Sequence, residues 1–312
     1  RVGIATGRVV VGDLVSSGGT ETGAIAGDTP NLAARLQAVA QPGDVVIGPT
    51  TRRLCGKEFI LETLGATRLK GYENEVEPHR VVAPSTVENR FSAQRLSGLA
   101  RLVGRVGERQ ILLDRWQSAL QDRGQVVMIS GDAGIGKSRL VEALMSEVNH
   151  TPHELVRMQC SPYHSTSAFH PIAERILRSS GIRPEDTADI RATKIKAMLE
   201  TTPQKVPRAA EVYAELLSIG HKENTEIGTL TPQNLKDLTI QTIVERMAAM
   251  ASQKPVLMVL EDSHWIDPSS QEVLERLTLR IADLPVLLLV TQRPEGASNW
   301  ALDYDNATLL PL

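Results

Sequence analysis

The stretch Gly131-Asp132-Ala133-Gly134-Ile135-Gly136-Lys137-Ser138 decides how the longer part of this chain folds. It follows the apolar, β-branched run 126–130, which predicts a buried strand. It precedes residues 139–148, where leucine and valine recur at helical spacing. This order of strand, loop and helix is the context in which the pattern G-x-x-x-x-G-K-S/T predicts a phosphate site. Backbone N–H groups of such a loop, with the positive end of the following helix, bind phosphate oxygens.

Each pattern residue of this loop has a predicted role. Gly131, Gly134 and Gly136 let the backbone turn its N–H groups towards phosphate oxygens. Lys137 is expected to reach the β- and γ-phosphates of ATP, and Ser138 is expected to hold Mg²⁺ through its hydroxyl. ATP and Mg²⁺ are therefore the predicted ligands. The alternative is a glycine-rich turn that matches by chance, and the complete pattern in the right context weighs against it.

Length and composition predict two domains in a globular protein. The chain has 312 residues, of which 41% are hydrophobic, 34 are basic and 37 are acidic. The net charge of −3 gives no support for a nucleic-acid partner. The longest apolar run, 284–290, fits a buried strand and is too short for a membrane helix, so no membrane partner is predicted.

Two further features bear on where the protein works and how much of it is present. Cys55 and Cys160 show no metal-ligand spacing and predict two reduced thiols, which favours a cytoplasmic location. We expect no signal peptide. The sequence begins at Arg1 inside a predicted strand, so we expect a piece of a longer protein, cut at both ends.

A second apolar run, 256–260, ends in the acid pair Glu261 and Asp262. In a phosphate-loop site such a strand delivers one carboxylate to the Mg²⁺ and a second that orients the attacking water. Their order assigns Glu261 to the metal and Asp262 to the water, although these roles could be exchanged. A further strand, 285–291, precedes Arg293, which could sense the γ-phosphate. A plain surface arginine is nearly as good an interpretation.

The first 83 residues predict a smaller mixture of strands and helices. A helix is expected over 29–40, with Thr29 as its N-cap. Asn31 and Arg35 are four residues apart and share its exposed face. Residues 13–22, rich in serine and glycine, are expected to form a loop. The other predicted elements are strands at 2–5, 8–11, 45–48, 59–64 and 76–82 and a short helix at 50–54.

The run 27–36 (Gly-Asp-Thr-Pro-Asn-Leu-Ala-Ala-Arg-Leu), with Val-Gly-Asp before it and Leu-Lys-Gly after it, resembles class III nucleotide cyclases. The resemblance covers residues 1–83, the C-terminal half of a catalytic domain with a ferredoxin-like α+β core. It implies that Asn31 and Arg35 steady the ribose and phosphates in the transition state and that Lys70 contacts the phosphates. It also implies a homodimer and ATP as substrate, with GTP left open.

The first segment also departs from the cyclase pattern. The family's two metal-binding aspartates lie upstream of the matching region, so the chain alone is expected to make no cyclic nucleotide. Ala24 stands where many members carry a base-reading aspartate or threonine, and no basic residue occurs between Arg8 and Arg35. An ATP-binding switch or scaffold with an inactive cyclase remnant is therefore the alternative function.

The phosphate loop, the acid pair and the continuation Ser-His-Trp-Ile-Asp at 263–267 resemble AAA-like signal-transduction ATPases, specifically those fused to cyclase domains. This resemblance implies a doubly wound α/β domain over 100–312, incomplete at its C-terminus, after a polar linker at 84–99. It places Arg105 near the adenine and Arg139 among the nucleotide-binding residues. The predicted whole is a cytosolic signalling protein that makes a cyclic nucleotide and carries an ATP-hydrolysing regulatory module.

Overall fold

The computed structural model divides the chain into two compact units, Arg1–Ala100 and Arg101–Leu312, which we describe separately. It describes residues 1–16, 19–55, 59–69, 72, 75–84, 104–183, 185–202, 206–219, 226–295 and 300–312. For residues 12–16, 19–26 and 84 it describes only the backbone. Within these ranges no helix has both the length and the apolar character needed to cross a membrane.

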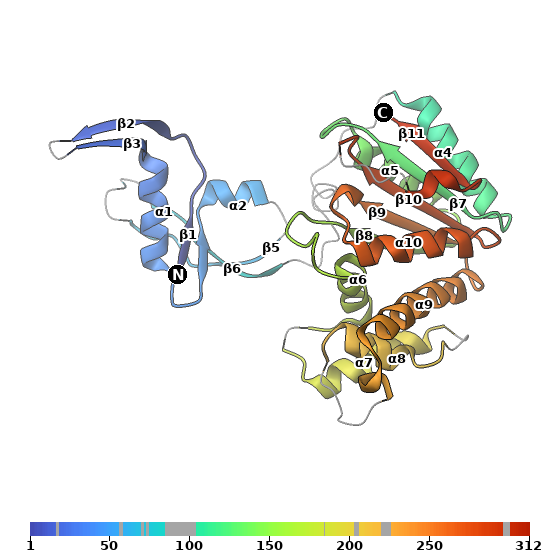
Figure 1. The fold of residues 1–312 in the computed structure, drawn as a ribbon. Coiled ribbons are helices and arrows are strands. Elements are labelled where there is room, and N and C mark those ends of the chain that lie inside the picture. The colour runs from blue at the N-terminus through green and yellow to red at the C-terminus, as the bar shows by residue number, and fades with distance from the viewer. Residues whose placement is uncertain are drawn as a thin grey trace. The chain divides into compact units, whose positions relative to one another are not determined.

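The first unit is built on a four-stranded sheet in the order β1-β4-β6-β5 (Figure 1). Helix α1 packs closely on β1, because a Cβ on Gly3 would stand 2.2 Å from the carbonyl oxygen of Ala33. Strands β2 and β3 form a separate antiparallel pair. The elements are β1 (Val2–Ile4), β2 (Val10–Ser16), β3 (Gly19–Ala26), α1 (Asp28–Val39), β4 (Val45–Ile47), α2 (Pro49–Cys55), β5 (Phe59–Thr63) and β6 (His79–Pro84).

Two local predictions for this unit are wrong. Residues 13–16 and 19–22 are not a loop, because they belong to β2 and β3, whose pairing supplies backbone hydrogen bonds that outweigh their low strand propensity. Thr29 does not cap α1, because its hydroxyl donates to the carbonyl of Arg8 at 2.9 Å. The helix instead begins at Asp28, after Gly27 with a φ of 132°.

The second unit contains a parallel five-stranded sheet in the order β11-β7-β10-β9-β8. Its strands are β7 (Gln125–Ser130), β8 (Glu154–Gln159), β9 (Val256–Glu261), β10 (Val286–Gln292) and β11 (Ala307–Pro311). Parallel strands that are buried on both faces show continuous apolar runs, as β7, β9 and β10 do. The predicted doubly wound α/β fold is confirmed.

Helices cover both faces of this sheet (Figure 1). Along β7, Val127 and Ile129 pack with α4 and α5, whereas Val126 and Met128 join the core beneath α6, α9 and α10. The helices are α4 (Val106–Ala119), α5 (Lys137–Val148), α6 (His170–Ser180), α7 (Ala188–Glu200), α8 (Ala209–Leu216), α9 (Pro232–Ala251) and α10 (Pro268–Arg280), with 3₁₀ turns η1 (Glu226–Thr229), η2 (Ser263–Trp265) and η3 (Trp300–Asp303).

Candidate functional site

The candidate site lies at the carboxyl edge of the parallel sheet. The glycine loop 131–136 follows β7, and β10 lies directly beside β7 with Gln292 opposite Ser130. Strand β9 pairs with the other side of β10 and ends in the acid pair. Because the strands are parallel, their carboxyl ends meet at one edge, where ligands of open α/β sheets bind.

The glycine loop combines one packed glycine with two open ones. A Cβ on Gly131 would stand 3.0 Å from Cγ2 of Ile135, so a larger residue here would require the Ile135 side chain to shift. Gly134 and Gly136 have φ values of 80° and 106°, and a Cβ on either would meet nothing within 4 Å. The positive φ values turn the chain into α5, and the open space leaves room for a ligand against the backbone.

The side chain of Lys137 is folded onto the loop. It is 8% exposed, and its Nζ donates to the carbonyls of Gly131 at 2.6 Å and Asp132 at 2.9 Å. Burial lowers the pKa of Lys137, the carboxylate of Asp262 opposes this, and the cation of Arg293 adds to it. A buried ammonium beside an open glycine loop suits the phosphate groups of a nucleotide. Ser138 and Arg139 follow in the first turn of α5, both half-buried.

The two residues of the acid pair have different surroundings. Glu261 is 3% exposed, and its Oε2 accepts from Nε of Arg157 at 3.1 Å and from Nη2 at 2.8 Å. Nη1 of Arg157 donates to Oε1 of Glu142 on α5 at 2.6 Å. Burial acts to lower the pKa of Arg157, but the two carboxylates outweigh it and the pKa is raised. Glu261 therefore belongs to a buried ionic cluster between β8, β9 and α5.

Asp262 has a strained backbone and a half-buried side chain. Its φ of 58° and ψ of 42° are left-handed, which is costly for a residue other than glycine and is typical of functional positions. Its N–H donates to Oγ1 of Thr291 at 3.0 Å, and its Oδ2 accepts from Nε2 of Gln159 at 3.5 Å. Asp262 also supplies the largest charge effect on the pKa of Lys137. The charge of Asp262 therefore acts on the loop lysine.

An aromatic pair, His264 and Trp265, lies beside these charges together with Arg293. The guanidinium carbon of Arg293 is 5.3 Å from the ring centroid of Trp265, a cation–π distance. The ring of His264 lies 4.2 Å from the same tryptophan, and neither of its buried nitrogens has a hydrogen-bond partner among the described residues. Burial lowers the pKa of His264, Asp262 opposes this, and the cations of Arg293 and Lys137 add to it.

The remaining predicted site residues lie away from the glycine loop or outside the described residues. Arg105, with a φ of 57°, pairs with Glu108, its Nη1 donating to Oε1 at 2.8 Å. Asn31 and Arg35 are exposed on α1 of the first unit, and Lys70 lies outside the described residues. The structure thus brings together the glycine loop, the acid pair and Arg293.

The buried cluster of Arg157, Glu142 and Glu261 was missed from the sequence. The available signal was a single arginine inside the largely apolar strand 154–159, because a buried arginine needs a buried partner. Clusters of three or more potential metal-ligating side chains are absent from the part of the chain that the structure describes.

Comparison with protein families agrees with both resemblances. The family model of the AAA ATPase domain matches residues 101–290, more than half of the chain, so the chain belongs to this family. The model of the adenylate and guanylate cyclase catalytic domain matches residues 1–82. The predicted combination of a cyclase catalytic segment and an AAA-like ATPase is therefore confirmed.

Individual relatives include an uncharacterized protein of Rhizobium meliloti (strain 1021), 31% identical over the whole of this chain. The chain spans 30% of the length of that relative. The guanylate cyclase domain of RhGC from Catenaria anguillulae, solved in complex with GTP, is 23% identical with a TM-score of 0.23, over 25% of this chain and 41% of that one. The adenylyl cyclase CyaB from P. aeruginosa is 26% identical with a TM-score of 0.22, over 24% of this chain and 37% of that one.

Proposed function

We propose that residues 100–312 bind and hydrolyse ATP and that this module regulates a nucleotide cyclase to which residues 1–83 belong. Residues 84–99, of which 85–99 lie outside the described part of the chain, would link the two. The observation that carries the proposal is the buried Lys137, which sits in an open glycine loop and is influenced by the charges of Asp262 and Arg293.

The residues of the site suit the phosphates of ATP. Lys137 would exchange its two carbonyl partners for phosphate oxygens, and the loop N–H groups would bind the same anions. Ser138 and Glu261 would hold Mg²⁺, which neutralises charge on the β- and γ-phosphates when bound. Asp262 would orient the attacking water, and Arg293 would stabilise charge on the γ-phosphate.

The exchanged assignment of the acid pair has support in the contacts. The Oε2 atom of Glu261 already accepts two N–H groups of Arg157, whereas Asp262 acts electrostatically on Lys137. Because its charge reaches the loop lysine, Asp262 is suited to hold Mg²⁺ as well as to orient the attacking water. Variants of each acid, measured for Mg²⁺ dependence and for turnover, decide between the assignments.

For the first unit we propose cyclisation of ATP to cyclic AMP in a homodimer, in the cytoplasm where ATP is available. Asn31, Arg35 and Lys70 would stabilise charge on the reacting phosphate. Dimerisation is supported by apolar side chains that this unit leaves exposed, such as Val10 at 70% and Ile60 at 50%. The second candidate, an ATP-binding switch with an inert cyclase segment, is supported by Ala24 at the base-reading position.

The test is equilibrium binding of ATP to this chain, with and without Mg²⁺. Lys137→Ala should weaken binding roughly 10- to 100-fold, because a charge-assisted contact to phosphate is lost. Lys196→Ala, which removes an exposed lysine on α7, should leave the affinity unchanged. Equal affinities in all three proteins would overturn the proposed ATP site.

A cyclase assay separates the two candidate functions. The chain itself should produce no cyclic nucleotide from ATP or GTP with Mg²⁺ or Mn²⁺. A longer protein that contains it should convert ATP to cyclic AMP. If that protein binds ATP and forms no cyclic product, the switch with an inert cyclase segment is the function.

A further inference from the structure

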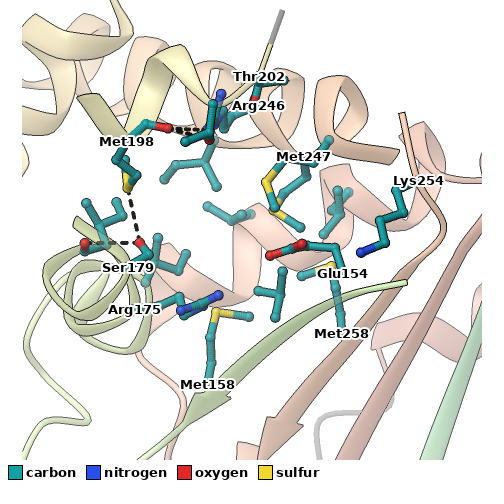
Figure 2. A pocket seen from close by; sticks show the side chains of 18 of the residues that line it. Glu154, Met158, Arg175, Ser179, Met198, Thr202, Arg246, Met247, Lys254 and Met258 are labelled. Atoms are coloured by element: carbon teal, nitrogen blue, oxygen red, sulfur yellow. Dashed lines mark hydrogen bonds between the residues drawn. The ribbon is translucent and has the colours of Figure 1, made fainter. Parts of the chain in front are cut away.

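A cavity in the second, ATPase unit lies away from the glycine loop. It has a volume of about 490 Å³ and is lined by residues of β8, β9, α6, α7, α9 and α10 (Figure 2). Glu154 begins β8 and Lys254 precedes β9, so the cavity includes the amino-terminal ends of these strands. The glycine loop and acid pair lie at the opposite, carboxyl ends, and none of their residues lines the cavity.

The wall of this cavity is rich in methionine. Five of the seven methionines in the chain line it: Met158, Met198, Met247, Met250 and Met258. Unbranched, polarizable thioethers adapt to apolar ligands of varied shape. A volume of this size lies within the range of roughly 300–1,000 Å³ that is typical of small-molecule sites.

The charged residues of the cavity are mostly cationic. Arg175, Arg246 and Lys254 line it together with one carboxylate, that of Glu154. Figure 2 shows Arg175 and Lys254 on different sides of the cavity, with Glu154 between them in this view. The ion pairs among the described residues include none that joins any two of these four.

Arg246 is a buried cation held by carbonyl groups. It is 7% exposed, and its guanidinium donates to the carbonyls of Leu199 at 3.1 Å and Met198 at 2.9 Å. Burial lowers the pKa of Arg246, and the effect of Tyr213 opposes this only in part. Arg175 likewise donates Nη2 to the carbonyl of Leu155 at 3.2 Å. Carbonyl partners satisfy these donors but leave the positive charges uncompensated, which favours an anion in the cavity.

We propose that this cavity binds an apolar small molecule with a single carboxylate, of the fatty-acid class. The hydrocarbon would lie among the methionines, and the carboxylate would lie towards Lys254. This site is separate from the proposed nucleotide site and goes beyond the proposed function.

The methionines allow the site to be located directly. The chain, labelled with ¹³C at the methionine methyl groups, is titrated with dodecanoate below its micelle concentration and followed by NMR. The five cavity methyl signals should shift saturably, whereas Met128 in β7 and Met145 in α5 should keep their positions. No saturable shift, or equal shifts of Met128 and Met145, would overturn the site.

The charge preference is tested with dodecanol as the matched neutral ligand. Lys254→Gln should weaken dodecanoate binding roughly two- to fivefold, because a partly exposed ion pair is lost, and leave dodecanol unaffected. Glu154→Gln should strengthen dodecanoate binding, and Lys196→Gln, outside this cavity, should change nothing. Equal affinity for both ligands, unaltered by these variants, would show an apolar cavity without anion preference and refute the proposal.

Discussion

The two units place their candidate residues in different settings. In the second unit the glycine loop, the acid pair and Arg293 stand on the tips of adjacent parallel strands, above cores that bury both sheet faces. In the first unit Asn31 and Arg35 lie exposed on one helix. The described core cluster of that unit has four buried members: Leu36, Ala40, Val46 and Leu69.

The difference shows how each site depends on its surroundings. Strand register fixes the distances at a sheet edge, so the second site is assembled by contacts within its own unit. An exposed helix face fixes only the direction of its side chains, and another surface must complete a site there. In this chain, single substitutions at the candidate site of the second unit should therefore have large effects, and those of Asn31 and Arg35 in the first unit should have small ones.

The largest expected effect is on ATP hydrolysis. Asp262→Asn keeps the size of the side chain and removes the charge that is proposed to orient water. Single-turnover hydrolysis should fall roughly 10²- to 10⁴-fold while ATP still binds. Glu261→Gln, the matched change in the neighbouring acid, should instead reduce the Mg²⁺ dependence of ATP binding. The reverse pattern would exchange the two roles, and normal hydrolysis in both variants would refute the site.

The two cysteines give a comparison of one residue type across the units. Burial, with smaller effects from Asp267 and Asp262, raises the pKa of Cys160 from its ordinary 9.0 to about 12. Its thiolate fraction at pH 8 is therefore lowered about 10³-fold relative to an ordinary thiol. Iodoacetamide at pH 8 should label the half-buried Cys55 first, and Cys160 only after unfolding, as read by mass spectrometry.

The raised pKa of Cys160 also predicts a stability change with pH. Above pH 9 the unfolded chain loses the thiol proton while the folded chain keeps it, so the free energy of unfolding should decrease as the pH rises. Cys160→Ala should remove this part of the alkaline dependence. Rapid labelling of native Cys160 would contradict both expectations.

The third expected effect is the loss of the buried cation. Arg157→Met leaves the carboxylates of Glu142 and Glu261 buried without their cation. The free energy of unfolding should therefore fall by about 3–5 kcal/mol. All three tryptophans, Trp116, Trp265 and Trp300, lie in the second unit, so urea unfolding followed by tryptophan fluorescence reports on that unit.

A matched arginine in the first unit is the control for this experiment. Arg35→Met, on the exposed face of α1, should leave the tryptophan transition unchanged. A cost below about 1 kcal/mol for Arg157→Met would mean that the two carboxylates remain solvated or neutral, against their burial in the structure.

Local patterns explain what the sequence could predict. Residues 126–148 contain the strand, the glycine loop and the helix start in one continuous run, and the apolar strand 256–261 ends in its acids. Once both strands are parallel members of one sheet, their carboxyl ends must lie at the same edge. The fold class and the meeting of loop and acid pair were therefore predictable from sequence.

Long-range pairing explains what the sequence could not predict. Arg157 and Glu261 are 104 residues apart, and no local pattern joins them. The pairing of β2 with β3 was missed because the serines and glycines of these strands have low strand propensity, which cross-strand pairing overrides. Thr29 was assigned as a cap on residue type alone, but the nearby carbonyl of Arg8 takes its hydroxyl.

The smallest expected effect is on the stability of the first unit. Asn31→Ala and Arg35→Ala remove exposed side chains from α1 and should change the free energy of unfolding by no more than about 0.5 kcal/mol. Hydrogen exchange of the α1 amides measures this without a tryptophan in the unit. A loss above about 1 kcal/mol would assign these side chains a structural role.

In a longer, cyclase-active protein that contains this chain, the same two variants should behave differently. Both side chains are proposed to act on charge that develops in the transition state, so turnover should fall while substrate affinity stays the same. Unchanged stability combined with reduced turnover is a result that a surface role cannot produce. Unchanged turnover and affinity would instead reduce Asn31 and Arg35 to solvated residues of an ordinary helix.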